Sequence, residues 1–384
     1  MNICRIIKSV DFSKFPIIAY YRKLSDVLTP VLVILIHVYA CINLLYYGER
    51  PIDALLRVQF ACLILLLTMQ IHSLNRVWFW VLLLANIIFV PISASKNIMA
   101  GFDVIYGVLF LSLLLFRQIT LSRKVYLAIH LFTAVFLTWF VGAADLLQMG
   151  YYRIVNHMIN PNMFGILSFA CMLHWMCFFE MLSVKWYYRL LGQGLALILS
   201  VSFILESGCR SALVGLTLFV LLCLVRYKAF GPRFYQILSI LMLIVLAIFP
   251  LVYVRYSAQL DNVIILEKNL FSGREDLWIQ LFEWIKQRPI FGNGITFKSS
   301  AHHILIELAT CLGIVPLISF FMLCGCVDRR FKRKRASRIA QIAFLAGMII
   351  ACFESFFTDR YLHIFFLSFL LSAVDPEMPD RRFE

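Results

Sequence analysis

Charged side chains are scarce in this sequence: they make up 15% of its 384 residues, whereas soluble domains carry about a quarter. Hydrophobic residues make up 62%, and the mean hydropathy is +0.87. This composition excludes an ordinary soluble domain. The first residues are polar and basic, without a short apolar core and a small-residue cleavage site, so we expect no cleaved signal peptide.

The cysteines and the positive charge exclude two further classes. The 11 cysteines are scattered through apolar stretches, without the spacing of a disulfide framework or of a zinc site. The net charge of +14 could indicate nucleic acid, but no basic stretch lies on a segment that could fold as a soluble unit. Basic residues of membrane proteins usually mark the cytoplasmic loops, so we expect no nucleic-acid partner.

Long apolar runs bounded by charged or turn residues predict about twelve helices that cross a hydrocarbon core of about 30 Å. They lie near 29–47, 54–72, 76–94, 99–116, 124–143, 163–183, 187–205, 211–227, 234–253, 303–325, 337–353 and 360–374. The sequence thus predicts an all-α, polytopic integral membrane protein that forms one membrane domain. Its parts are helices 1–9 with short loops in 1–253, a long outer loop in 254–302, and helices 10–12 with a short tail in 303–384.

Lysine and arginine are concentrated in alternate loops, and the densest run is Arg329–Arg335. The positive-inside rule places these loops and both termini in the cytoplasm. Two larger segments, 144–162 and 254–302, then lie outside. A loop of this length in an otherwise economical membrane protein is usually functional.

The long loop contains an amphipathic helix. Its apolar stripe consists of Leu277, Trp278, Leu281, Phe282 and Ile285. We expect this helix to begin after Gly273, to end before Pro289, and to lie on the membrane surface or cap a cavity.

Seven polar residues fall in outer loops or at outer helix ends: Arg153, His157, Arg210, Arg274, His302, Glu354 and Arg360. Polar groups at membrane depth are costly unless they are paired or face water, so each is a candidate for function. Their shared side indicates an active site that faces outward.

Arg210 and Arg274 each stand at a helix start, with a glycine two residues before Arg210 and one directly before Arg274. A helix N-terminus with a guanidinium group is an anion site, and two such sites would form a clamp for phosphate or diphosphate. The alternatives are an interfacial pair of Arg210 with Glu206, and a salt bridge of Arg274 to Glu275 or Asp276.

His302 and His303 begin the tenth predicted helix, and Glu307 follows about one turn later. Zinc needs three convergent ligands, and nothing nearby completes a set, so we expect no metal. A histidine beside arginines is suited to general-base work on a hydroxyl; the alternative is an interfacial histidine without a role. Asn162 lies in a turn that enters the sixth helix, where it could shape the site or only begin the helix.

Together these segments resemble the bacterial O-antigen ligase and O-antigen polymerase superfamily. Ser207-Gly-Cys-Arg210-Ser-Ala is similar to its serine–arginine motif, and Ser272-Gly-Arg274-Glu-Asp-Leu-Trp with the later Pro289-Ile-Phe-Gly-Asn-Gly resembles its signature. Ala301-His302-His303-Ile-Leu resembles its closing histidine helix. The eleven-residue step from His302 to Gly313 favours His302 as the functional histidine. The family usually has Asn or Ser at the next position, where this chain has His303.

The resemblance implies an inverting, metal-independent glycosyltransferase with a GT-C-like helical fold and no cofactor, in the bacterial inner membrane. The donor would be a glycan on undecaprenyl diphosphate at the periplasmic face, with Arg210 and Arg274 on the diphosphate and His302 as the base. Supporting residues would be His303, Glu307, Arg153, His157, Asn162 and Arg360.

The acceptor distinguishes two branches of the superfamily. A polymerase extends another lipid-linked glycan, and a ligase transfers the chain to lipid A-core. About eight residues separate Gly294 from His302, which slightly favours the polymerase, because a bulky lipid A-core would need more periplasmic structure. Membrane lipids and a chain-length regulator protein are further expected partners. A transporter of lipid-linked glycans remains the alternative from another class, although transporters usually carry their charges at the midplane.

Overall fold

The computed structural model describes residues 16–45, 58, 61–62, 64–66, 121–146, 152–154, 157–225, 232–260, 264–265, 268–269, 274–293, 302–318, 320–321, 338–354, 365 and 369. The helices predicted near 54–72, 76–94, 99–116 and 360–374 lie wholly or mostly outside these residues. The count of twelve helices therefore stays a prediction.

Four helices of the described part are long and apolar enough to cross a membrane. They are residues Lys23–Leu45 of α2 (Pro16–Leu45), α6 (Arg123–Gly142), α7 (Pro161–Met181) and α8 (Trp186–Ser207). Shorter apolar helices are α9 (Arg210–Val225), α14 (Arg338–Ile350) and residues Ile240–Tyr256 of α10 (Pro232–Leu260). The predicted class, a helical membrane protein, is confirmed.

Most helix bounds agree with the sequence patterns, and three differ. Helix α2 begins at Pro16, well before residue 29, because the polar turn at 22–26 continues the helix. Helix α10 runs past 253 to Leu260, with Pro250 inside it and non-helical backbone at Tyr256. Helix α12 (Ile304–Leu312) stops at Gly313, whose φ of +82° interrupts the helix expected over 303–325.

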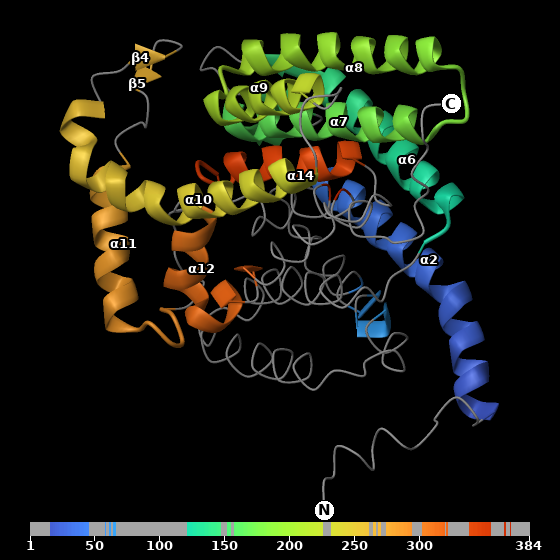
Figure 1. Ribbon diagram of the computed structural model, residues 1–384, viewed down its shortest axis with the longest axis horizontal. Helices are drawn as coiled ribbons and strands as arrows, with labels where there is room; N and C mark the ends of the chain where they lie inside the picture. The colour runs from blue at the N-terminus through green and yellow to red at the C-terminus, as the bar shows by residue number, and fades with distance from the viewer. Residues whose placement is uncertain are drawn as a thin grey trace, which may run out of the picture.

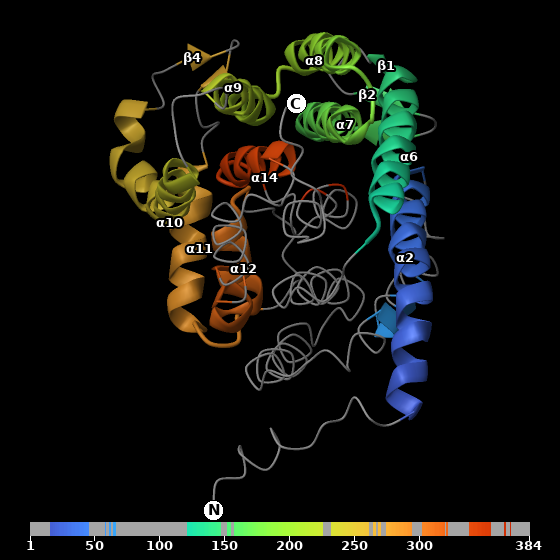
Figure 2. The ribbon, with the colours of Figure 1, turned by 45° about the vertical axis from the view of Figure 1, so that its right-hand side comes forward.

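Helix α7 is the centre of the bundle. It lies between α6 and α8 and also contacts α9 and α14 (Figures 1 and 2). Its side chains are apolar all round, so it is stable only where neighbours cover every face. Glycines allow the closest approaches: a Cβ on Gly165 would clash with Cys209, and one on Gly192 would clash with the ring of Phe179.

Other helices of the bundle are covered on one face and expose apolar side chains on another. Helix α14 lies beside α9, where Gly215 meets the side chain of Ile350 (Figure 1). Helices α8, α9 and α10 expose many large apolar side chains, among them Leu199, Leu224 and Ile244. Such faces are normal only where lipid replaces water.

Two small antiparallel sheets qualify the expectation of an all-α chain. The first has the order β1 (Ala144–Leu146), β2 (Tyr152–Ile154), β3 (His157–Ile159), and the second pairs β4 (Ile264–Ile265) with β5 (Lys268–Asn269). Both lie in the segments predicted to be outer loops. The periodicity of the apolar runs could not predict them because their strands have only two or three residues.

The amphipathic helix of the long loop is α11 (Glu275–Gln287), with the predicted start and stop. Its stripe is covered by protein: Trp278 and Leu281 are buried and cluster with Tyr253 of α10 and Ile306 of α12. In Figure 1, α11 runs alongside α12. The apolar stripe of α11 therefore packs against α10 and α12, and its place on the membrane surface or over a cavity stays a prediction.

At each end of the bundle, the start of one helix contacts the end of another. At one end, Arg123 at the start of α6 donates hydrogen bonds to the carbonyl of Met181 and to Ser183, beyond the end of α7. At the other end, the start of α12 bonds to the end of α14, through the Ile304 amide and the Ala351 carbonyl at 3.1 Å.

Candidate functional site

Glu354, just beyond α14, joins four elements of the fold. Its Oε1 accepts hydrogen bonds from Asn162 Nδ2 at 2.9 Å and from Arg274 Nη2 at 3.3 Å. Its Oε2 lies 2.8 Å from His302 Nδ1. The side chains of Glu354, Arg274 and His302 are 10%, 15% and 32% exposed. A carboxylate so far from water requires partners of this kind.

Arg274 occupies the N-cap position of α11, with φ −78° and ψ 0°. Its Nη1 donates to the carbonyl of Phe353 at 2.6 Å, and its Nη2 pairs with Glu354. The guanidinium therefore crosses to the end of α14, and the alternative of a local salt bridge to Glu275 or Asp276 is wrong.

Arg210 is the first residue of α9 and follows a tight turn. Gly208 ends α8 with a φ of +62°, and the Ser207 hydroxyl accepts from the Cys209 amide at 3.1 Å. A side chain at position 208 would be strained, since only glycine adopts this conformation readily. The turn aims the N-terminus of α9 at the end of α14.

Arg210 and Arg274 line the same cavity of about 110 Å³. Its other lining residues are Asn162, Ser211, Val214, Phe353 and Glu354. Two guanidinium groups against one carboxylate leave the lining with a net positive charge. Together with the N-terminus of α9, this arrangement favours an anion with several oxygen atoms.

His302 has a φ of +50°, which is uncommon for a residue with a side chain. Such backbone conformations concentrate at functional sites, where surrounding contacts hold them. Because the carboxylate of Glu354 can only accept, the proton of the neutral imidazole lies on Nδ1 and the lone pair on Nε2. Nε2 is then the nitrogen that can take a proton.

The neighbouring His303 has a structural role. It is the N-cap of α12: its Nδ1 accepts from the Ile306 amide at 3.4 Å. Its ring is fully buried between Phe249 and Trp278. Burial lowers the pKa of His303 to about 3, so the ring stays neutral and can keep accepting. The family's usual Asn or Ser at this position would cap the helix in the same way.

The other expected site residues divide as follows. Asn162, in the first turn of α7, lines the cavity. Glu307 lies in the first turn of α12, outside the cavity lining. Arg153 is exposed in β2, opposite Asp145 of β1, and is also not part of the lining. His157 begins β3, but its side chain is not described, and Arg360 lies outside the described residues.

The missed member of the site is Glu354. The sequence placed it among the seven outer polar residues, but its neighbours in the chain carry no motif. The signal that could have found it is an acidic residue at the end of an apolar helix, where it needs a cationic partner.

The glycines of the resembling motifs hold α11 against α12. Gly292 (φ +69°) and Gly313 (φ +82°) lie so close to the partner segment's backbone that a Cβ on either would clash with it. The Asn293 amide donates to the Thr310 carbonyl at 2.7 Å, and the Ile314 amide donates to the Pro289 carbonyl at 3.1 Å. The C-terminal ends of the two helices are thus locked together.

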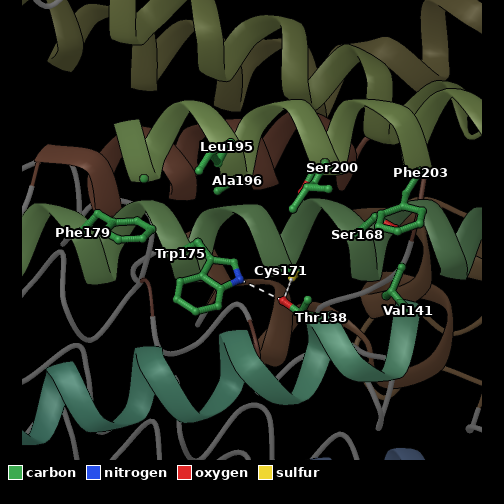
Figure 3. A pocket seen from close by; sticks show the side chains of 12 residues that line it. Thr138, Val141, Ser168, Cys171, Trp175, Phe179, Leu195, Ala196, Ser200 and Phe203 are labelled. Atoms are coloured by element: carbon green, nitrogen blue, oxygen red, sulfur yellow. Dashed lines mark hydrogen bonds between the residues drawn. The ribbon is translucent and has the colours of Figure 1, made fainter. Parts of the chain in front are cut away.

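A second cavity, of about 220 Å³, lies between α6, α7 and α8 (Figure 3). Trp175 and Phe179 from α7 face Leu195 and Phe203 from α8 across it. Its walls are almost entirely apolar, so they suit hydrocarbon and offer nothing to stabilise a developing charge.

Three buried histidines lie elsewhere, on α2, α6 and α7. His130 Nδ1 is 3.0 Å from His174 Nδ1, and His174 Nε2 is 3.0 Å from the Phe365 carbonyl, while His37 bonds the Val33 carbonyl at 2.8 Å. In the described part of the chain, no group of three or more His, Cys, Asp or Glu residues is arranged to hold a metal.

The fold and the site define a polytopic helical membrane protein with a positively charged cavity built from helix ends. Residues 195–321, about a third of the chain, match the family described as O-antigen ligase. This segment includes Arg210, Arg274 and His302, and the match confirms the resemblance to the O-antigen ligase and polymerase superfamily that the motifs indicated. A comparison with curated proteins finds no match.

Proposed function

We propose that this protein is an inverting, metal-independent glycosyltransferase of surface-polysaccharide assembly. It transfers a glycan from undecaprenyl diphosphate to a sugar hydroxyl at the periplasmic face of the bacterial inner membrane. The observation that carries the proposal is the shared cavity of Arg210 and Arg274, next to the pair of His302 and Glu354.

The reaction needs a stabilised leaving group and a base. The acceptor oxygen bonds to the anomeric carbon as the bond from that carbon to the diphosphate oxygen breaks, and the electron pair leaves with the diphosphate. The guanidinium groups of Arg210 and Arg274 stabilise the charge that develops there. Nε2 of His302 takes the proton of the acceptor hydroxyl. Neither step requires a divalent ion.

Two acceptors remain candidates. The short segment between Gly294 and His302 slightly favours a polymerase, whose acceptor is a second lipid-linked glycan. The matching family is described as O-antigen ligase, which favours lipid A-core. A transporter would need to release the diphosphate lipid with its glycan still attached, and the pairing of a base with a diphosphate site favours bond formation.

The test is transfer of glycan by the purified full-length protein in lipid nanodiscs. An undecaprenyl-diphosphate glycan serves as donor, and lipid-linked glycan and lipid A-core are supplied in separate reactions. We expect product with one acceptor, undiminished by EDTA. Activity that is lost in EDTA and restored by Mg²⁺ or Mn²⁺ would overturn the mechanism. Absence of product with both acceptors, together with movement of the intact donor across a bilayer, would favour the transporter.

A further inference from the structure

We propose that Glu354 is a positioning residue that sets the proton position and orientation of His302 and, through its other oxygen, couples this base to Arg274. The inference rests on the proposed function. It concerns a residue outside the matched segment of 195–321, at the end of a helix that no motif marks.

The two oxygens of the Glu354 carboxylate have different partners. Oε2 faces Nδ1 of His302 at 2.8 Å, while Oε1 is held by Asn162 at 2.9 Å and by Arg274 at 3.3 Å. The two contacts on Oε1 fix the plane of the carboxylate and therefore the direction from which Oε2 meets the imidazole. A carboxylate in this position holds a histidine in one tautomer and stabilises the imidazolium that forms when the base takes a proton.

The backbone supports the same assignment. His302 is held at a φ of +50°, and the next amide but one, that of Ile304, bonds to the Ala351 carbonyl three residues before Glu354. The end of α14 thus fixes His302 by a main-chain bond and a side-chain bond together. Strain of this kind persists only where surrounding contacts over-determine the residue.

The decisive variant is Glu354→Gln, because glutamine keeps the volume and one acceptor oxygen. Its amide can donate to Nδ1 of His302 and so select the wrong tautomer. We expect kcat to fall by about 10²-fold or more, toward the rate of His302→Ala. Affinity for the donor should be unchanged or higher, since one negative charge has left the cavity.

The controls separate this role from a merely structural one. Glu283→Gln removes an exposed carboxylate of α11 that pairs with Lys286; it should keep the wild-type rate. The double variant Glu354→Gln with His302→Ala should be no slower than His302→Ala alone, because two residues of one unit are not additive.

Two results would overturn the inference while the proposed function stands. One is an active wild type in which Glu354→Gln keeps the wild-type rate. The other is a loss of rate that multiplies with that of His302→Ala and comes with weaker donor binding, which would indicate a collapsed site. An inactive wild type with every acceptor would contradict the proposed function itself.

Discussion

Replacement of Arg274 by Ala tests the guanidinium clamp most directly. The change removes two hydrogen bonds, to the Phe353 carbonyl and to Glu354, of which the second is an ion pair. A bond to a charged group contributes about 1.5–3 kcal/mol, and Glu354 keeps its contacts to Asn162 and His302. We therefore expect the free energy of unfolding to fall by roughly 2–4 kcal/mol, with the fold retained.

The effect on transfer should be larger than this loss of stability explains. Loss of one preorganised donor to a developing negative charge lowers kcat by about 10²- to 10³-fold. Arg274→Lys should restore part of the stability, because an ammonium can still reach the Glu354 carboxylate or the Phe353 carbonyl. It should restore little of the rate, since a point charge cannot reproduce the planar fork that binds two phosphate oxygens.

The assay is kcat/KM for the lipid-diphosphate donor in nanodiscs, measured together with the thermal unfolding midpoint. Arg288→Ala is the matched control, because Arg288 lies just beyond the other end of α11 and is exposed. A wild-type rate for Arg274→Lys would refute the bidentate fork. A loss in Arg274→Ala no greater than in Arg288→Ala would refute the clamp.

Four further results are expected. His302→Ala should lose about 10²- to 10⁴-fold in transfer but keep its affinity for the donor in a binding assay; full activity would remove its assignment as base. His303→Ala should lose about 1 kcal/mol or more of stability with the N-cap, while His303→Asn should recover it; equal unfolding midpoints would contradict the cap. Because the pKa of His303 is lowered from 6.5 to about 3, its burial destabilises the protein as pH falls from 6.5 toward 3, so the unfolding midpoint should drop more steeply there than in His303→Asn. Reporter fusions after Lys268 and after Arg335 should lie on opposite sides of the membrane, and the same side for both would overturn the assigned orientation.

The grouping of Arg210, Arg274 and His302 was predictable because its determinants are local. A glycine shortly before an arginine, a helix start and the alternation of basic loops are all read from neighbouring residues, whereas the side of the membrane that the group faces stays a prediction. The distinction between His302 and His303 also came from spacing, and the structure gives it a physical reason in the N-cap of α12.

The contacts between distant segments were not predictable in the same way. Glu354 lies 192 residues from Asn162 and 52 from His302, and no periodic pattern relates positions so far apart. The short strands were missed because the pairing of β2 with β1 and β3 depends on a turn that brings them together. The early stop of α12 at Gly313 was hidden because the apolar run continues past it, and only the close approach of the Ile290 backbone requires the left-handed turn.

The lock between Gly292 and Gly313 has a mechanical consequence. It joins α11 and α12 at the ends away from the cavity. The two helices are therefore held rigidly together, and Arg274 and His302 lie at their opposite ends. The distance between Arg274 and His302 is then set by the contact of Gly292 with Gly313, about one helix length away. A side chain added at Gly292 or Gly313 would increase this distance without touching any residue of the cavity. Changes at these glycines should therefore alter which glycans fit between the leaving group and the incoming hydroxyl.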